Sequence, residues 1–245
     1  TGGAGSVGLA VAQHFASAGA HLVLADRGAD RLEAAAAQFP DTTMTVVADL
    51  GDAAGVDAMI RQIEARFGQI HILAHTVGGY IAGPPVHETP PDTWERMFTL
   101  NVRPVYTVCG RVAQHMLENA IPGKIVIVLA RAAMAGSAGS GAYTASKAAA
   151  QRIMQSMALE LRDRGINVNG VMPSIIDASC RYQQVGDGRG YRRRHRLPGV
   201  RGCAQPSRRQ SGGLRARVSG FTGSSSHHDV RCLMRMRSMA AFQRS

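Results

Sequence analysis

The sequence predicts an α/β fold, in which a doubly wound parallel sheet lies between two layers of helices. Apolar and β-branched runs alternate with amphipathic stretches over the first 177 residues, which favours right-handed strand–helix–strand units. Glycine, Asp or Pro follows several of the runs, where the carboxyl ends of parallel strands bind ligands. The expected strands are 22–25, 43–47, 70–74, 124–129 and 166–172, and the expected helices are 7–18, 30–38, 53–67, 92–119 and 141–164.

The first expected helix follows a glycine-rich opening, in which Gly3, Gly5 and Gly8 satisfy the spacing G-x-G-x-x-G. Such glycines permit a tight turn and a close approach of the backbone to a pyrophosphate, and the helix N-terminus adds N–H groups and a positive dipole. A glycine-rich loop without a ligand is the alternative. The context favours a dinucleotide, because a strand-like run ending in Asp26 follows the helix.

Asp26 lies 21 residues after Gly5, close to the spacing expected for the acid that accepts from a ribose 2′-hydroxyl. A carboxylate at this position repels a 2′-phosphate, so the sequence favours NAD over NADP. The neighbouring Arg27 keeps NADP open as the alternative, because a guanidinium binds phosphate well.

A glycine loop of this kind normally follows a strand, yet the sequence starts at Thr1. We therefore expect a fragment that lacks a short N-terminal piece and, with it, a strand that would be central in the sheet. No apolar run approaches the 18 residues of a membrane-spanning helix, and no secretory signal is recognisable. Cys109, Cys180, Cys203 and Cys232 lack metal-ligand spacing and suggest a reduced, cytoplasmic chain.

Tyr143 and Lys147 stand four residues apart at the start of an expected helix. Residues at this spacing share one face of a helix, one turn above each other. An ammonium held beside a phenol favours the phenolate and lowers the pKa of the phenol, which gives a general acid/base near neutral pH. An exposed Lys beside a half-buried Tyr on an amphipathic helix is the alternative, and the pair alone does not decide between the two.

Several motifs match one known family together and in order. They are Thr1-Gly2-Gly3-Ala4-Gly5-Ser6-Val7-Gly8, Asp26, Asp49-Leu50, Leu100-Asn101-Val102, the pair Tyr143 and Lys147, and Ile166-Asn167-Val168-Asn169 leading to Met172-Pro173. Over residues 1–177 the chain therefore resembles a short-chain dehydrogenase/reductase. This family has a Rossmann-like αβα fold, and relative to it the chain is expected to lack the first strand and the C-terminal elements.

The resemblance implies hydride transfer between a nicotinamide cofactor and a carbonyl or secondary alcohol. Tyr143 would be the general acid/base, Lys147 would lower its pKa and bind the nicotinamide ribose, and Asn101 would hold a water that links Lys147 to solvent. For Asn101 the alternative is a buried amide that satisfies backbone groups at a helix bend. The implied cofactor contacts are Gly2, Gly3, Gly5, Ser6, Val7, Gly8, Asp26, Asp49, Leu50, Gly78, Tyr143, Lys147, Pro173 and Ile176, and no metal site is expected.

Two departures from the family pattern bear on activity. Ala130 stands 13 residues before Tyr143, where the family usually has a Ser that hydrogen-bonds the substrate oxygen. Loss of one such donor costs roughly 10²–10³ in rate, without excluding catalysis. His75 stands where the family has an Asn that ties neighbouring strands together, and we expect a structural role for it.

The composition changes sharply after residue 177. Residues 1–177 carry a net charge of −2, whereas residues 178–245 contain 15 Arg, no Lys and only Asp187 and Asp229 as acids, a net charge of +13. Gly, Ser and Arg dominate without an apolar period, so we expect this tail to be disordered. One interpretation is a basic arm for nucleic acid or anionic membrane. We favour the other, a shifted reading frame in a GC-rich gene, because the resemblance stops at the same point.

Two functional classes remain open. The first is an NAD(P)-dependent oxidoreductase that acts on a small carbonyl or alcohol, and the second is a non-catalytic nucleotide-binding remnant of such an enzyme. Ala130 and the tail favour the second, whereas the intact Tyr143, Lys147 and Asn101 favour the first. By resemblance, a homo-oligomer would form through helices 92–119 and 141–164, and neither nucleic acid nor membrane is an expected partner.

Overall fold

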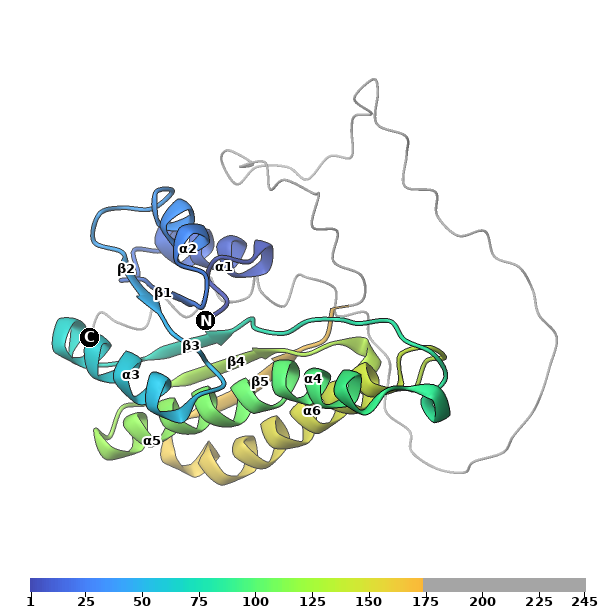
Figure 1. The fold of residues 1–245 in the computed structure, drawn as a ribbon. Coiled ribbons are helices and arrows are strands. Elements are labelled where there is room, and N and C mark those ends of the chain that lie inside the picture. The colour runs from blue at the N-terminus through green and yellow to red at the C-terminus, as the bar shows by residue number, and fades with distance from the viewer. Residues whose placement is uncertain (174–245) are drawn as a thin grey trace, which may run out of the picture. The chain divides into compact units, whose positions relative to one another are not determined.

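The computed structural model divides the chain into two units, Thr1–Arg181 and Tyr182–Ser245. It describes residues 1–173, all in the first unit, and Figure 1 shows their fold. The predicted boundary after residue 177, the arginine-rich tail and Ile176 therefore lie outside the described residues.

Short parallel strands form two sheets within residues 1–173, where the sequence predicts one. The first sheet has the order β1-β2 and the second the order β3-β4-β5, and every pairing in both is parallel. The strands are β1 (Val23–Asp26), β2 (Met44–Val47), β3 (Ile72–His75), β4 (Lys124–Val128) and β5 (Asn167–Val171), each within two residues of its predicted bounds. The parallel pairing confirms the predicted topology of strands joined through helices.

Residues Thr1 to Gly3 explain why the strands fall into two sheets. The Thr1 amine donates to the carbonyl of Ala74 at 2.9 Å, and the Thr1 carbonyl accepts from Thr76 N at 3.2 Å. On the other side, Gly3 N donates to the carbonyl of Ala25 at 3.2 Å. This short segment thus bonds to the ends of both β3 and β1. These two strands do not pair with each other, so they belong to separate sheets.

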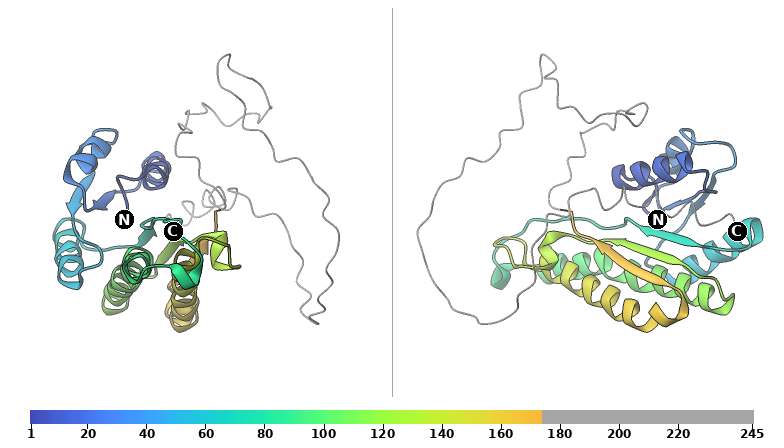
Figure 2. Two further views of the ribbon diagram at one scale, coloured as in Figure 1. Left: turned by 45° about the vertical axis from the view of Figure 1, so that its right-hand side comes forward. Right: turned by 180° about the vertical axis from the view of Figure 1, so that it is seen from behind.

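Helices cover both sides of the strands. Figures 1 and 2 show α1 and α2 on one side, and α3, α5 and α6 on the other. The helices are α1 (Ser6–Ser17), α2 (Ala29–Ala36), α3 (Ala53–Phe67), α4 (Pro91–Asn101), α5 (Gly110–Glu118) and α6 (Gly141–Leu161), with the short helical turns η1 (Val86–Glu88), η2 (Val105–Cys109), η3 (Arg131–Ala133) and η4 (Arg162–Arg164). None of these helices is both long and apolar enough to cross a membrane.

The long helix predicted at 92–119 is wrong in one respect, because α4 and α5 are separated by the π-helical segment η2. Pro104 stands directly before η2 and has no N–H, so the regular i→i−4 ladder is interrupted there. The wider turn lets the Thr107 hydroxyl donate to the carbonyl of Leu50, beyond the end of β2. The π segment therefore fastens this helix to the loop after β2.

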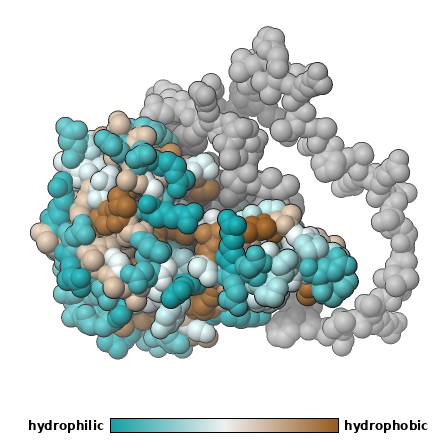
Figure 3. Space-filling model, viewed as in Figure 1, coloured by the Kyte–Doolittle hydropathy of each residue, from teal (hydrophilic) through white to brown (hydrophobic). Residues whose placement is uncertain are grey.

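Two apolar clusters fill the space between strands and helices. In β1, Leu24 packs with Ala12, Leu32 and Ala35 from α1 and α2, whereas the neighbouring Ala25 faces the larger core beneath both sheets. Side chains alternate between faces along a strand, so adjacent residues of β1 serve different clusters. The larger core also contains fully buried residues of β4 and η2 (Ile125, Ile127, Val108 and Cys109). Over the described surface, apolar patches lie among hydrophilic side chains (Figure 3).

Candidate cofactor and catalytic site

The glycine loop leads from the start of the chain into α1 and packs against β1, which leaves no room for side chains on Gly3 and Gly8. Gly2 has a φ of +70°, and Gly5 N donates to the Gly2 carbonyl at 3.0 Å. A Cβ on Gly8 would lie 2.1 Å from the Gly2 oxygen, and a Cβ on Gly3 would lie 3.0 Å from the Cβ of Leu24. Only glycine fits at position 8, because the obstructing atom belongs to the backbone.

The N-terminus of α1 fits an anionic group. Gly5 is the N-cap and makes no side-chain capping bond, and the first turn, which includes Ser6 and Val7, contains no acidic residue. The first N–H groups of a helix have no partner within the helix, and the helix dipole favours negative charge at this end. The predicted loop residues therefore form a backbone cradle suited to a pyrophosphate.

Asp26 ends β1 and is fixed beside this cradle. Its Oδ1 accepts from Arg27 N at 2.8 Å and from the Arg31 guanidinium at 3.4 Å, and its Oδ2 accepts from Ala4 N at 3.3 Å. The Asp26 side chain is only 12% exposed, whereas Arg31 is 63% exposed. Arg31 is thus the cation that pairs with Asp26, in addition to the neighbouring Arg27 that the sequence singled out for a phosphate. Arg31 lies in the first turn of α2, five residues after Asp26, and this position is what could have indicated the ion pair from the sequence.

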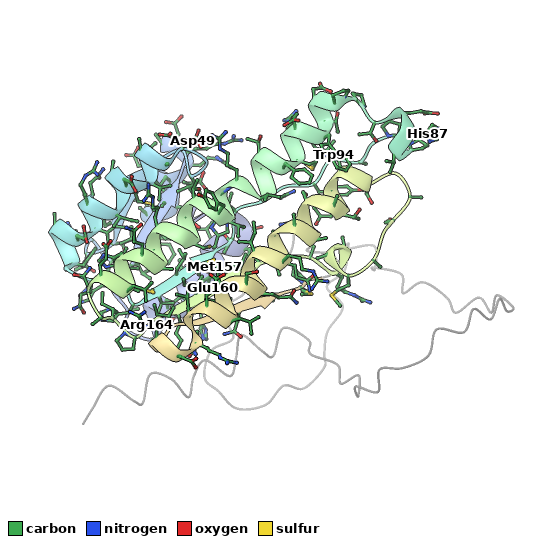
Figure 4. All side chains as sticks on the ribbon, turned by 90° about the horizontal axis from the view of Figure 1, so that it is seen from below. Asp49, His87, Trp94, Met157, Glu160 and Arg164 are labelled. Atoms are coloured by element: carbon green, nitrogen blue, oxygen red, sulfur yellow. The ribbon has the colours of Figure 1, made fainter. Side chains whose placement is uncertain are left out.

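The two residues predicted after β2 differ in role. Asp49 is exposed, and its Oδ1 accepts from Gly51 N at 2.9 Å, which shapes the turn into α3. Leu50 is buried, and its carbonyl accepts from Thr107. Figure 4 labels Asp49 on the loop between β2 and α3. Asp49 is therefore the member of the pair whose side chain is available to a ligand.

Tyr143 and Lys147 lie in the first two turns of α6. Lys147 is 6% exposed, its Nζ donates to the Val128 carbonyl at 3.4 Å, and burial lowers the pKa of its ammonium to about 8. Partial burial, and then the neighbouring Tyr80, raise the pKa of Tyr143. The structure therefore does not show the expected lowering of the Tyr143 pKa. Burial opposes the phenolate, and the lysine reaches toward β4.

Asn101 joins the loop after β3 to α6. Its Oδ1 accepts from Gly79 N at 2.9 Å, and its Nδ2 donates to the Gly79 carbonyl and to Ser146 Oγ, each at 3.0 Å. Ser146 in turn donates to the Tyr143 carbonyl at 2.8 Å. The Asn101 side chain therefore satisfies backbone groups at a helix end, which was the alternative interpretation for it. Sequence reasoning missed Ser146, although it directly precedes Lys147.

Gly78 lies against both the Lys147 ammonium and the Asn101 amide. A Cβ there would lie 2.7 Å from Lys147 Nζ and 2.9 Å from Asn101 Oδ1. A Cβ on Gly2 would lie 2.6 Å from Thr76 Oγ1 and 3.1 Å from Val77 N, so the glycine loop packs against the same stretch of chain. Contacts are therefore continuous from the glycine loop, through residues 76–78, to Lys147 and Asn101.

The residues that depart from the family pattern occupy buried positions. His75 is fully buried, it shares a hydrogen bond of 2.9 Å with the Thr1 hydroxyl through Nδ1, and burial lowers its pKa to about 3. It is therefore neutral and ties β3 to the start of the chain. Ala130 is 5% exposed and brings no hydroxyl to the end of β4. Pro173, the last described residue, accepts from Arg131 N at 3.0 Å.

The described part of the chain contains no cluster of three or more His, Cys, Asp or Glu able to hold a metal ion. The candidate site thus consists of a backbone cradle, one fixed carboxylate and a buried network around α6.

Comparison with known proteins assigns this arrangement to a family. Residues 1–187 match the sequence model of the short chain dehydrogenases. The chain belongs to this family. By descent it is an oxidoreductase, and its Rossmann-like fold is the one predicted.

Named relatives of the chain are dehydrogenases. It is 33% identical over 177 residues to galactitol 2-dehydrogenase of Agrobacterium fabrum, covering 72% of this chain and 69% of the relative. It is 31% identical to sorbitol dehydrogenase of Cereibacter sphaeroides with the same coverage.

Solved structures agree with these relatives. A short chain dehydrogenase from Bacillus anthracis matches with a TM-score of 0.69 at 28% identity, covering 72% of this chain and 75% of that one. An NAD⁺-bound xylitol dehydrogenase matches with a TM-score of 0.68 at 29% identity, covering 71% and 67%.

Proposed function

We propose that this chain transfers a hydride between a nicotinamide dinucleotide, NAD in preference to NADP, and a small carbonyl or secondary alcohol. The observation that carries the proposal is the continuous packing from the glycine loop through residues 76–78 to Lys147 and Asn101. This packing supports a site in which a phosphate cradle and the Tyr–Lys pair share one end of the strands. The NAD⁺-bound and NADH-bound states of related structures support the choice of cofactor.

In this proposal the nicotinamide supplies or accepts the hydride, and the protein moves the proton. Tyr143 donates its phenolic proton to a carbonyl oxygen, or accepts the proton of an alcohol. Lys147, whose pKa is held at about 8, is the nearby group that stabilises the phenolate and binds the nicotinamide ribose. Asn101 holds Gly79 and α6 in register through the hydrogen bonds that its side chain makes to Gly79 and Ser146.

The cofactor preference rests on Asp26. Its carboxylate, fixed by the backbone of the glycine loop, favours a free 2′-hydroxyl and repels a 2′-phosphate, while Arg31 partly offsets that repulsion. Asp49, Leu50, Gly78 and Pro173 complete the proposed cofactor surface. We extend the proposal to a cytoplasmic location and to a homo-oligomer formed through α4, η2, α5 and α6, which Figure 4 shows side by side on one face.

The test is binding followed by turnover with the full chain. Titration of protein into NADH and into NADPH, followed by nucleotide fluorescence, should give the lower Kd for NADH. Loss of nicotinamide absorbance on addition of ketones then reports hydride transfer. Absence of binding to either nucleotide would refute the proposal, and binding without transfer to any carbonyl would favour the non-catalytic remnant.

A further inference from the structure

Tyr80 presents an aromatic ring beside Tyr143. The two ring centroids are 4.8 Å apart with an angle of 88° between the planes, an edge-to-face contact. Tyr80 is nevertheless 60% exposed, so most of its ring faces outward next to the proposed acid/base. An exposed aromatic side chain at such a position offers apolar contact area to whatever binds there.

The backbone around Tyr80 is held firmly. The preceding Gly79 is bound through both its N–H and its carbonyl by the Asn101 side chain, which is 1% exposed. The same amide bonds Ser146 on α6, which carries Tyr143. Further along the loop, Gly83 N donates to the Gly139 carbonyl at 2.9 Å, just before α6. The position of the Tyr80 ring relative to Tyr143 is therefore built into the fold before any ligand arrives.

Three side-chain hydroxyls close to Tyr143 in the sequence already donate to backbone carbonyls of their own segment. Ser140 donates to the Ser137 carbonyl, Thr144 to the Gly141 carbonyl and Ser146 to the Tyr143 carbonyl, at 3.1, 3.0 and 2.8 Å. Ala130 has no hydroxyl to offer. A polyol needs several polar partners to replace its hydration, because each unsatisfied polar group costs binding free energy. The described surroundings of Tyr143 suit an apolar group better.

We propose that Tyr80 determines substrate specificity by packing its ring against an aryl or alkyl group next to the reacting carbon. The inference rests on the proposed function, and it names the substrate class as aryl or alkyl ketones and their secondary alcohols rather than polyols. In reduction, the carbonyl carbon takes the hydride of NADH and its oxygen takes the proton of Tyr143. The products are the secondary alcohol, NAD⁺ and a Tyr143 phenolate that regains its proton from solvent.

The test compares acetophenone and fructose as substrates of the full chain with saturating NADH. Tyr80→Ala should lower kcat/KM for acetophenone by about tenfold or more, mainly through KM, and change that for fructose by less than about twofold. Tyr80→Phe keeps the ring and should retain the wild-type preference. Ile72→Ala removes a 47%-exposed apolar side chain at the amino end of β3 and is the matched control, with no change in the ratio. Equal effects of Tyr80→Ala on both ketones would overturn the proposal.

A second measurement separates this inference from the proposed function. Binding of benzamide, which is not reduced, to protein with NAD is measured by calorimetry for the same variants. Weaker binding by Tyr80→Ala, with Tyr80→Phe and Ile72→Ala unchanged, upholds the role of the ring even where no ketone is turned over. Where no ketone is turned over, benzamide binding that is absent or independent of Tyr80 overturns the role of the ring.

Discussion

The two ends of the candidate site are built by different means. Around the glycine loop, the proposed recognition depends on backbone groups and on the absence of side chains, and the adjoining cluster has four buried apolar residues (Ala12, Leu24, Leu32 and Ala35). Around α6 it depends on the side chains of Asn101, Ser146 and Lys147, each at most 6% exposed. The first region should thus be damaged by adding atoms and the second by removing them.

The largest expected effect is on chemistry at the α6 end. Tyr143→Phe removes the proton donor and should lower kcat by roughly 10²–10⁴. The Kd for NADH should stay within about twofold, because the glycine loop is untouched. Steady-state kinetics and fluorescence titration on the same preparation check both numbers. Wild-type turnover in this variant would remove Tyr143 from the mechanism.

Adding one methyl group should break the glycine-loop end. In Gly8→Ala the new Cβ meets the Gly2 oxygen, so the backbone must move, at a cost of up to about 3 kcal/mol in unfolding free energy and with loss of NADH binding. Gly110→Ala is the matched control, because a Cβ there meets nothing within 4 Å and alanine favours the helix. Urea unfolding with and without NADH distinguishes the two. Normal NADH affinity in Gly8→Ala would show that the loop is not the cradle.

Removing the amide of Asn101 should damage the other end. Asn101→Ala leaves Gly79 N–H and carbonyl groups without their partner, at a cost of about 1–3 kcal/mol in unfolding free energy. We expect lower kcat as well, because Tyr80 and α6 lose their common tie, whereas the Kd for NADH should change little. A large rise in that Kd with unchanged kcat would contradict the division between the two ends.

The pH dependence of stability tests the burial of Lys147. Below pH 8 its ammonium is charged in both folded and unfolded chains, so the cost of burying it is fully present. Between pH 8 and 10.5 the folded chain loses this proton first, and stability should rise relative to Lys147→Met, by roughly 1.4 kcal/mol per unit of pKa lowering. Urea titrations of both proteins across this window measure the difference, and parallel curves would mean that the ammonium is solvated.

The smallest expected effect comes from the exposed cation beside Asp26. Arg31→Ala should change the unfolding free energy by less than about 1 kcal/mol, because the ion pair is mostly in solvent. Its informative readout is the ratio of Kd values for NADPH and NADH, which should increase when the guanidinium is gone. A matched change at the exposed Arg66 should leave the ratio unaltered. A ratio that falls in Arg31→Ala would argue against a phosphate contact.

Sequence patterns correctly predicted the features that are set by residues close together in the chain. The strand positions, the glycine loop and Asp26 follow from apolar periodicity and spacing, which the chain encodes directly. The division of the strands into two sheets depends instead on contacts between residues more than 70 positions apart, such as Thr1 with Ala74. The single helix predicted at 92–119 took no account of Pro104, which directly precedes the π-helical segment between α4 and α5.

Burial accounts for most of what was missed in the site. Spacing showed that Lys147 shares a helix face with Tyr143, but not that its ammonium would turn to the Val128 carbonyl. The raised pKa of Tyr143 follows from how much protein surrounds it, which no motif states. No sequence motif pointed to Tyr80, because its proposed role depends only on its contact with the Tyr143 ring.

The hydrogen bonds of Thr1 and Gly3 to opposite sheets also have a mechanical meaning. The segment that leads into the proposed nucleotide cradle connects the two sheets by hydrogen bonds, in addition to the apolar core that the sheets share. We therefore expect a ligand that immobilises the cradle to stabilise the contacts between the two sheets as well. Ligand binding should then also lower the rate of amide hydrogen exchange in parts of both sheets that the ligand does not contact.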